Sequence, residues 1–559
     1  AKQLVETIRA ATETTPETII SYTKDAAGRT IATRRDVGPM TATESTEYDD
    51  LGRVISSTDM LGRTTRTGYG EDGLTTTTTT PAGATLITKK YYDGTILWQG
   101  GTGQREVETK LELSEEGILT TTLSKGVVLS RILKNGFGQT VRQEHPNTRG
   151  GFIVTRNFYN DKGQSVRSQT EDLAPTLTDY NELGQAVKQT VLLDELHPND
   201  TTRNRISESS SCYRVREDGV YQVQTSTTCN ADGFPLTQTT ENMVSRLSAV
   251  LENKSITTDV YGQQNIQWTE YTSPTRRTWF SRIPTSEITA ESLVVDGFET
   301  SQTDHAGIRS SQTRSYASTG MVLKHTDARG NVTTTETDLA GRTVKVTDSA
   351  GNVTTNNYLP CCDNPACITD ALVGTTCYSY DIRGRKTAEY GTAIQPACFA
   401  YDEADRMVAL TTFRANEGDI TSDPSGRTDG DTTTWLYDEA TGLELKKTYA
   451  DGSCVSRTYD ELNRQETLVK ARGLVITYKY APFTGELISV SYSDGTSPWI
   501  FSSNHLGQII SVYDASGLRE FSYDSYGRMI QDTSFGQVES SLQEEYDAQG
   551  RSNGYRLML

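Results

Sequence analysis

The chain has 559 residues, a length that requires several domains or an array of repeats. Its net charge of −19 disfavours binding to nucleic acids and to anionic membranes, because such a surface repels phosphate groups. Apolar residues make up 34% of the chain and occur only in short runs, so we expect no segment that spans a bilayer.

From the N-terminus onward, short alternating segments dominate the sequence. Only residues 1–12 hint at helical periodicity, whereas segments such as 343–347, 475–480 and 487–492 alternate and are bounded by Gly, Asp or Asn. Short strands joined by tight turns predict an all-β protein. The first residue is Ala rather than Met, which we interpret as processing or excision from a longer chain, so a targeting segment is not visible.

One turn motif recurs along the chain: Tyr, Asp, two variable residues, Gly and Arg. Its complete copies are 21, 22 and 23 residues apart at Tyr380 to Tyr401, Tyr437 to Tyr459 and Tyr523 to Tyr546. Weaker copies lie midway, so a unit of about 20 residues holds two strands and two turns. The residues that we assign to these turns are Tyr48, Asp49, Gly52, Arg53, Asp338, Gly341, Arg342, Tyr380, Asp381, Gly384, Arg385, Tyr459, Asp460, Tyr523, Asp524, Gly527, Arg528, Tyr546, Asp547, Gly550 and Arg551.

Each residue of the motif has a predicted structural role. The Asp accepts a hydrogen bond from the backbone N–H two residues on, with cation binding as the alternative. The Gly position, occupied by Asp405 and Asn463 in two copies, requires a positive φ. The Tyr buries its ring and leaves its hydroxyl in water. The Arg pairs with an Asp of the adjacent hairpin or stacks on the next Tyr.

The repeated Tyr-Asp-x-x-Gly-Arg motif resembles the RHS/YD-repeat family, which includes bacterial rearrangement-hotspot proteins, the B and C components of insecticidal Tc toxins, and animal teneurins. The resemblance runs from about Tyr22 to Arg551. It implies spiralling antiparallel β-hairpin repeats that form a hollow shell or barrel-like wall around a C-terminal segment. The family's core-associated segment, which is rich in Asp-Pro-x-Gly and precedes a variable C-terminal effector, is absent from this sequence, so we assign no cleavage site and no effector.

The regularity of the motif divides the chain into four stretches. Residues 1–20 form an N-terminal lead-in, 21–190 a repeat region, 191–320 degenerate repeats or an insertion, and 321–559 a regular repeat region with a Cys-rich segment at 361–398. We interpret 191–320 as a diverged part of the same sheet. A plug, or an aromatic platform for sugars around Trp268, Tyr271, Trp279 and Phe280, is the alternative.

The cysteines offer disulfides, free thiols or a metal site. Cys212 and Cys229 flank a predicted hairpin turn and could be joined across the strands. Cys361, Cys362, Cys367 and Cys377 form a cluster whose spacing matches no standard zinc motif, so disulfides are favoured over free thiols and over a metal.

No catalytic constellation and no cofactor motif is found in the sequence: HExxH and a Walker loop are absent, and neither GxSxG nor GxGxxG stands on a predicted strand–helix junction. By resemblance, the favoured function is a structural shell segment of a secreted or cell-surface bacterial protein that encloses a C-terminal toxin or effector segment. The alternative is an extracellular module for carbohydrate binding or cell adhesion, whose partners are glycans or another surface protein. A carbohydrate-active enzyme is a third hypothesis.

Overall fold

The computed structural model describes residues 3–11, 14–273, 275–414, 420–536, 539–547 and 551–559. These residues form 47 β-strands and one short 3-10 helix, η1 (Pro424–Gly426), and they contain no α-helix. Every described strand pairing is antiparallel and joins neighbours in chain order, as in β1–β2, β26–β27 and β45–β46. The predicted all-β hairpin repeat is therefore confirmed. The helical hint at residues 1–12 is wrong, because Gln3–Arg9 forms β1 and pairs along its whole length with β2.

The strands group into two compact units, and each unit combines segments that are far apart in the sequence. Unit 1 comprises residues 1–109, 271–280 and 288–435, and unit 2 comprises 110–270, 281–287 and 436–559. The sequence-based boundaries at residues 20, 190 and 320 do not coincide with these units. The lead-in at 1–20 is itself part of the sheet, since β1 and β2 pair with each other and β2 pairs with β3.

Unit 1 holds two runs of strands. The first is β1 (Gln3–Arg9), β2 (Thr18–Lys24), β3 (Thr30–Val37), β4 (Met40–Tyr48), β5 (Val54–Thr58), β6 (Thr64–Tyr69), β7 (Thr75–Thr79), β8 (Thr85–Lys90) and β9 (Ile96–Gly101). The second is β24 (Ala290–Val295), β25 (Phe298–Thr303), β26 (Arg309–Ala317), β27 (Gly320–Thr326), β28 (Val332–Thr337), β29 (Thr343–Thr347), β30 (Val353–Tyr358), β31 (Pro365–Asp370), β32 (Gly374–Tyr380), β33 (Lys386–Tyr390), β34 (Ala397–Tyr401) and β35 (Met407–Thr412).

Unit 2 also holds two runs. The first is β11 (Gly117–Ser124), β12 (Val127–Lys134), β13 (Thr140–Pro146), β14 (Phe152–Tyr159), β15 (Ser165–Thr170), β16 (Thr176–Tyr180), β17 (Ala186–Val191), β18 (Arg205–Val215), β19 (Gly219–Cys229), β20 (Pro235–Arg246) and β21 (Leu251–Thr258). The second is β37 (Glu444–Thr448), β38 (Cys454–Tyr459), β39 (Gln465–Val469), β40 (Val475–Tyr480), β41 (Leu487–Tyr492), β42 (Trp499–Ser503), β43 (Ile509–Asp514), β44 (Gly517–Tyr523), β45 (Met529–Gly536), β46 (Glu539–Tyr546) and β47 (Ser552–Met558). The strands at the unit boundaries are β10 (Gln104–Ser114), β22 (Gln264–Ser273), β23 (Arg276–Arg282) and β36 (Asp431–Tyr437).

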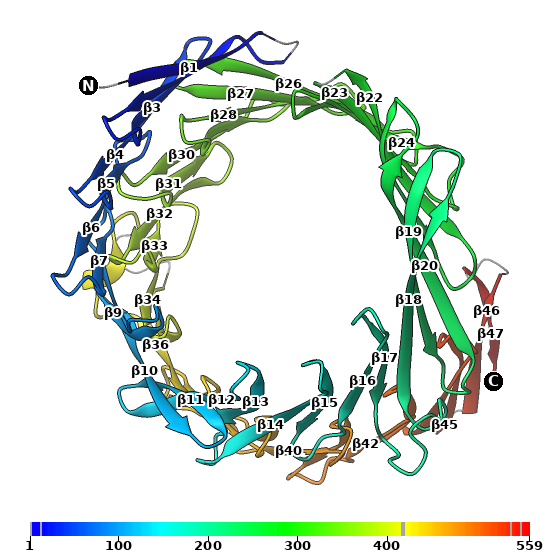
Figure 1. Ribbon diagram of the computed structural model, residues 1–559. Helices are drawn as coiled ribbons and strands as arrows, with labels where there is room; N and C mark the ends of the chain where they lie inside the picture. The colour runs from blue at the N-terminus through cyan, green and yellow to red at the C-terminus, as the bar shows by residue number, and fades with distance from the viewer. Residues whose placement is uncertain (1–2, 12–13, 274, 415–419, 537–538, 548–550) are drawn as a thin grey trace. The chain divides into compact units, whose positions relative to one another are not determined.

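Inside each unit the two runs lie side by side and touch through their hairpin loops. Figure 1 shows strands β4–β7 of the first run beside β30–β34 of the second. In unit 1, Arg63 of the β5–β6 loop pairs with Asp363 of the β30–β31 loop, and the N–H of Arg105, at the start of β10, donates to the carbonyl of Glu403 in the β34–β35 loop at 2.8 Å. In unit 2, Asn463 of the β38–β39 loop contacts Thr148 and Pro146 of the β13–β14 region. The side-chain contacts of this kind join residues 280 to 317 positions apart. The loops, rather than the strands, therefore connect one run to the other.

Residues 191–320 continue the antiparallel order rather than interrupting it. Strands β18 to β22 pair successively, and so do β24 to β27. Strands β18, β19 and β20 have 11, 11 and 12 residues, which is longer than most of the strands in the regular repeats. Within the described part of the chain there is no helix of the length and hydrophobicity that a membrane span needs.

Candidate functional site: the repeated turn and the Cys361–Asp363 loop

A single aspartate organises each regular turn. In the turn at 49–53, the Asp49 N–H donates to the Arg53 carbonyl at 2.9 Å, and the Gly52 N–H donates to the Asp49 carbonyl at 2.9 Å. Asp49 Oδ1 accepts from the backbone N–H groups of Leu51 at 3.0 Å and of Arg53 at 2.8 Å. The predicted hydrogen bond from the residue two positions on is confirmed, and the same oxygen also fixes the residue four positions on.

The arginine of the motif binds the aspartate of its own turn. Arg53 Nε donates to Asp49 Oδ2 at 2.7 Å, and the same contact recurs at 2.6 to 2.7 Å in the turns that begin at Asp25, Asp59, Asp381, Asp402, Asp460, Asp524 and Asp547. The predicted pairing with an adjacent hairpin occurs as well, for example between Arg385 and Asp405 at 3.1 Å. The pairing inside the turn was not predicted; it arises because the closed turn brings the first and fifth residues together.

The tyrosine of the motif joins its hairpin to the preceding one through both its ring and its hydroxyl. The Arg53 guanidinium carbon lies 4.1 Å from the centroid of the Tyr69 ring, so the predicted stacking is confirmed. The Tyr69 hydroxyl donates to the Val54 carbonyl at 3.0 Å. The prediction did not include this hydrogen bond, which is solvent-exposed at Tyr69, Tyr523 and Tyr546 and partly buried at Tyr48.

This pair of contacts is repeated along the chain. In each case the carbonyl that accepts from the tyrosine belongs to the residue directly after the preceding turn, which closes at its fifth residue or, at 359–364 and 438–443, at its sixth. The donor–acceptor pairs include Tyr48 to Thr30, Tyr358 to Thr343, Tyr380 to Pro365, Tyr459 to Glu444, Tyr480 to Gln465, Tyr523 to Ile509 and Tyr546 to Met529. The Tyr-Asp-x-x-Gly-Arg motif is thus a lock between successive hairpins, which we call the turn lock.

The glycine position adopts the predicted left-handed conformation. Gly52 has φ +82°, and the two non-glycine occupants, Asp405 and Asn463, have φ +64° and +61°. Both exceptions use their side chains. Asn463 donates to the Pro146 carbonyl and accepts from the Thr148 N–H, each at 3.1 Å, while Asp405 accepts from Arg383. Of the predicted turn residues, Gly550 lies outside the described residues.

Sequence reasoning missed a correlation inside the motif. Where Asn replaces the turn Asp, the fifth residue is Gln in four turns, and Asn Nδ2 donates to Gln Oε1 at 2.7 to 3.0 Å. These turns are Asn135–Gln139, Asn160–Gln164, Asn181–Gln185 and Asn504–Gln508. Asp327 and Asp348 are instead paired with Asn331 and Asn352, at 2.8 Å. The first and fifth residues change together because they touch, so comparing the copies with one another would have revealed the contact.

The hydrogen bonds of the turn also favour the ionised aspartate. The Arg53 backbone N–H lowers the pKa of Asp49; partial desolvation opposes this effect, and the Arg53 side chain lowers the pKa further. For Asp381, burial alone would raise the pKa, but the hydrogen bonds from the Arg385 backbone and side chain outweigh it and lower the pKa. In the turns that contain Asp, these contacts therefore stabilise the carboxylate form.

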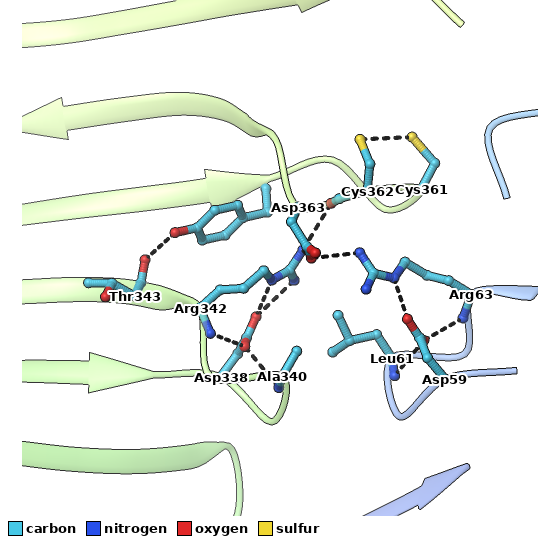
Figure 2. A network of polar contacts seen from close by, with 11 residues as sticks. Asp59, Leu61, Arg63, Asp338, Ala340, Arg342, Thr343, Cys361, Cys362 and Asp363 are labelled. Carbon is cyan, nitrogen blue, oxygen red and sulfur yellow. Dashed lines mark hydrogen bonds and ion pairs between the residues drawn. The ribbon is translucent and has the colours of Figure 1, made fainter. Parts of the chain in front are cut away.

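The loop at 359–364 connects the two runs of unit 1. Figure 2 shows the Asp363 carboxylate between two turn arginines, Arg63 of the first run and Arg342 of the second. Arg63 Nη1 donates to Asp363 Oδ1 at 2.7 Å, while Arg342 Nη1 lies 3.4 Å from the same oxygen and donates to the Cys362 carbonyl at 3.0 Å. One carboxylate therefore links two turn locks from different parts of the sequence.

The cysteines of the predicted cluster divide into two pairs. Cys367 and Cys377 lie directly opposite each other on β31 and β32 and form a disulfide. Cys361 and Cys362 remain thiols, and their sulfur atoms are 3.4 Å apart. The cross-strand disulfide between Cys212 and Cys229 is wrong, because the register of β18 and β19 places Cys212 opposite Val223, and both thiols are free.

The predicted alternative of a metal held by all four clustered cysteines does not fit this arrangement, since two of them are used in the disulfide. Among the described residues, no group of three or more His, Cys, Asp or Glu side chains is placed to hold a metal ion. The turn aspartates point into their own turns and accept from their own backbone and arginine. The polar groups of the turn lock are therefore used to join hairpins.

A family model described as RHS Repeat matches residues 48–85 of this chain. A search of curated proteins found no match. Among solved structures, a crystal structure of TcdB2-TccC3-TEV is similar to this chain with 12% identity and a TM-score of 0.49, and the match covers 99% of this chain and 36% of that one. The Tc holotoxin pore of Photorhabdus luminescens is similar with 12% identity and a TM-score of 0.46, covering 97% of this chain and 33% of that one. The chain thus spans about a third of the length of these two chains.

Proposed function

We propose that this chain is an RHS-repeat protein, as the family model that matches residues 48–85 indicates, and that it is a wall segment of a shell that encloses a polypeptide. The observation that carries the proposal is the turn lock, which joins successive regular hairpins by the same two contacts in both units. A sheet built in this way can be extended sideways by any number of identical steps.

Two further features support a wall rather than a packed domain. Fully buried side chains of large residues are few among the described residues, as Tyr221 and Phe413 illustrate, so the sheet spreads its residues over a large area. In each unit, loops from one run seal against loops from the other, as at Arg63–Asp363 and at Asn463–Pro146. The wall of a container needs both properties: a sheet with a large area for its number of residues, and contacts that join neighbouring runs of strands.

We further propose that the enclosed polypeptide is a C-terminal toxin or effector segment and that the protein is secreted or displayed on a bacterial cell surface. The Cys367–Cys377 disulfide supports an oxidising compartment. We propose a structural and not a catalytic role for the wall, since the carboxylates and guanidinium groups of the motif are used by the turn lock.

Protease protection tests this proposal. The full gene product that contains this chain should protect the polypeptide downstream of the repeats from trypsin, whereas the same polypeptide expressed alone should be digested. Digestion at equal rates in the two samples would refute enclosure. The alternative, an adhesion module, predicts that the 559-residue chain alone binds glycans on an array, and binding there together with a lack of protection would favour that function.

A further inference from the structure

The thiols of Cys361 and Cys362 form a preorganised pair. Cys361 Sγ donates to Cys362 Sγ at 3.4 Å, and Figure 2 shows both sulfur atoms on the side of the loop away from the Asp363 carboxylate. Burial raises the pKa of the Cys361 thiol, and its hydrogen bond with Cys362 raises it further.

The loop that carries this pair is fixed at three places. The Leu359 N–H donates to the Asn364 carbonyl at 3.0 Å and closes the loop. The Cys362 carbonyl accepts from Arg342, and the Asn364 amide donates to the Gly384 carbonyl at 3.0 Å. Two thiols held side by side by a fixed backbone lose little conformational freedom when a single atom bridges them.

A cavity gives access to the two sulfur atoms. Cys361 and Cys362 line a space of about 840 Å³ together with Pro81, Leu359, Tyr380 and Ile382, among other residues of unit 1. Both cysteines are partly exposed. The walls are largely apolar near the thiols, which suits a ligand with a hydrophobic substituent.

The number of cysteine sulfurs and the distance between them indicate which atom can bind to both. Zinc requires about four protein ligands in a structural site, and the described residues supply no such set here. Consider an atom that bridges the two sulfurs with a bond of about 2.3 Å to each. If the sulfur–atom–sulfur angle is about 90°, the sulfurs are about 3.3 Å apart, and if it is 180°, they are about 4.6 Å apart. The observed 3.4 Å matches the pyramidal geometry of a trivalent metalloid and is too short for a linear ion such as monovalent copper.

From these observations we propose that Cys361 and Cys362 form a dithiol site for trivalent arsenicals. An organoarsenic(III) oxide would react with both thiols. Two As–S bonds form, the As–O bond breaks, and the two thiol protons leave with the oxygen as one water molecule, so no oxidant or reductant is required. The hydrophobic substituent on arsenic would occupy the cavity beside Tyr380 and Ile382.

Native mass spectrometry of the 559-residue chain with phenylarsine oxide, under non-reducing conditions that keep the Cys367–Cys377 disulfide, tests the site. We expect one adduct per chain, which a small dithiol added after binding removes. The Cys361→Ser and Cys362→Ser variants should each lose at least tenfold in affinity. Cys398→Ser is the matched control, because Cys398 is also a free, partly exposed thiol of unit 1, and it should bind as the wild type does.

Three results would overturn the proposal. They are equal binding by wild type and Cys361→Ser, equal losses in Cys361→Ser and Cys398→Ser, or no adduct on the wild type. A fourth result, a Cys361–Cys362 disulfide in the purified protein, would also overturn the proposal; it would be detected as two missing thiols in a thiol titration. Thermal unfolding of each variant in the absence of arsenical separates a loss of the site from a loss of the fold.

Discussion

The short hairpins β28–β35 and the long hairpins β18–β21 are held together in different ways. Strands β28–β35 have five to seven residues, and turn locks such as Tyr358–Arg342 and Tyr380–Pro365 join them. Strands β18–β20 have 11 or 12 residues, and the β18–β19 turn closes through a simple bond from the Arg216 N–H to the Gly219 carbonyl. A longer strand makes more ladder hydrogen bonds, so it depends less on its turn.

The long hairpins also bury side chains that the short ones do not. The side chains of Tyr221 and Val223 are almost completely buried, and the buried Glu241 carboxylate accepts from both Arg214 and Arg216. The comparison shows that the Tyr-Asp-x-x-Gly-Arg motif is incomplete in the hairpins that are stabilised by buried side chains. Hairpins β18–β20 are therefore stabilised by burial, whereas the turn at Asp259–Gln263 in the same stretch keeps the aspartate hydrogen bonds of the regular repeats.

The largest expected effect comes from removing the most buried aromatic ring of the long hairpins. Tyr221 is 0% exposed, so Tyr221→Ala should destabilise the protein by about 3–5 kcal/mol, as expected for a large-to-small change in a packed site. Urea unfolding followed by circular dichroism measures this loss. Tyr213→Ala, at a site that is 71% exposed on the neighbouring strand, should stay within about 0.5 kcal/mol of wild type. If both variants lost a similar free energy of unfolding, burial would not be what stabilises the long hairpins.

A turn glycine of the short hairpins should be the next most sensitive position. Gly341 has φ +81° and no atom within 4 Å of an added Cβ, so Gly341→Ala costs only backbone strain, about 1–2 kcal/mol. Gly341→Asn should cost less, because Asn463 adopts this conformation elsewhere in the chain. Gly136→Ala is the control, since Gly136 also has open space around it but no positive φ. The same urea midpoints decide the order of the three variants.

Whether the sequence predicts a contact depends on how far apart its two residues are along the chain. Asp49, Gly52 and their equivalents act within five residues, so their roles in the turn follow from the motif alone. The reach of Tyr358 to the Thr343 carbonyl depends on the register of two strands, and composition does not indicate it. The register also explains the error at Cys212, which lies opposite Val223. The contact between Arg63 and Asp363 spans 300 residues, and no local pattern encodes it.

Removing one tyrosine hydroxyl of a turn lock should have a moderate effect. Tyr358→Phe keeps the ring under Arg342 but removes one of the two donors to the Thr343 carbonyl, which then accepts only from the Asn356 side-chain amide, so the change should cost about 1 kcal/mol. The control is Tyr92→Phe, because the Tyr92 side chain is 96% exposed. If the two variants unfold at the same urea concentration, the hydroxyl contributes nothing to the joining of hairpins, and the contrast with the long hairpins weakens.

The smallest expected effect tests whether the turn requires charge or only a matched pair. Asp49→Asn keeps an oxygen for the Leu51 and Arg53 N–H groups but removes the charge that pairs with Arg53, so its urea midpoint should fall slightly at pH 7. Asp49→Asn/Arg53→Gln should recover most of the loss, because Asn160 and Gln164 already form this pair at 2.8 Å. Asp50→Asn, at the exposed neighbouring residue, should leave the midpoint unchanged.

The pH dependence of the same variants separates charge from shape. The pKa of Asp49 is lower in the folded protein than in the unfolded chain, so its stabilisation is fully present above the unfolded value of about 3.9 and is lost as the pH falls through the folded value. The difference in urea midpoint between wild type and Asp49→Asn should therefore be constant from pH 7 to about pH 5 and should narrow below about pH 4. A difference that stays constant down to pH 2 would mean that the turn needs the shape of the pair and not its charge. In that case the Asp–Arg and Asn–Gln turns would be equivalent solutions to the same steric requirement.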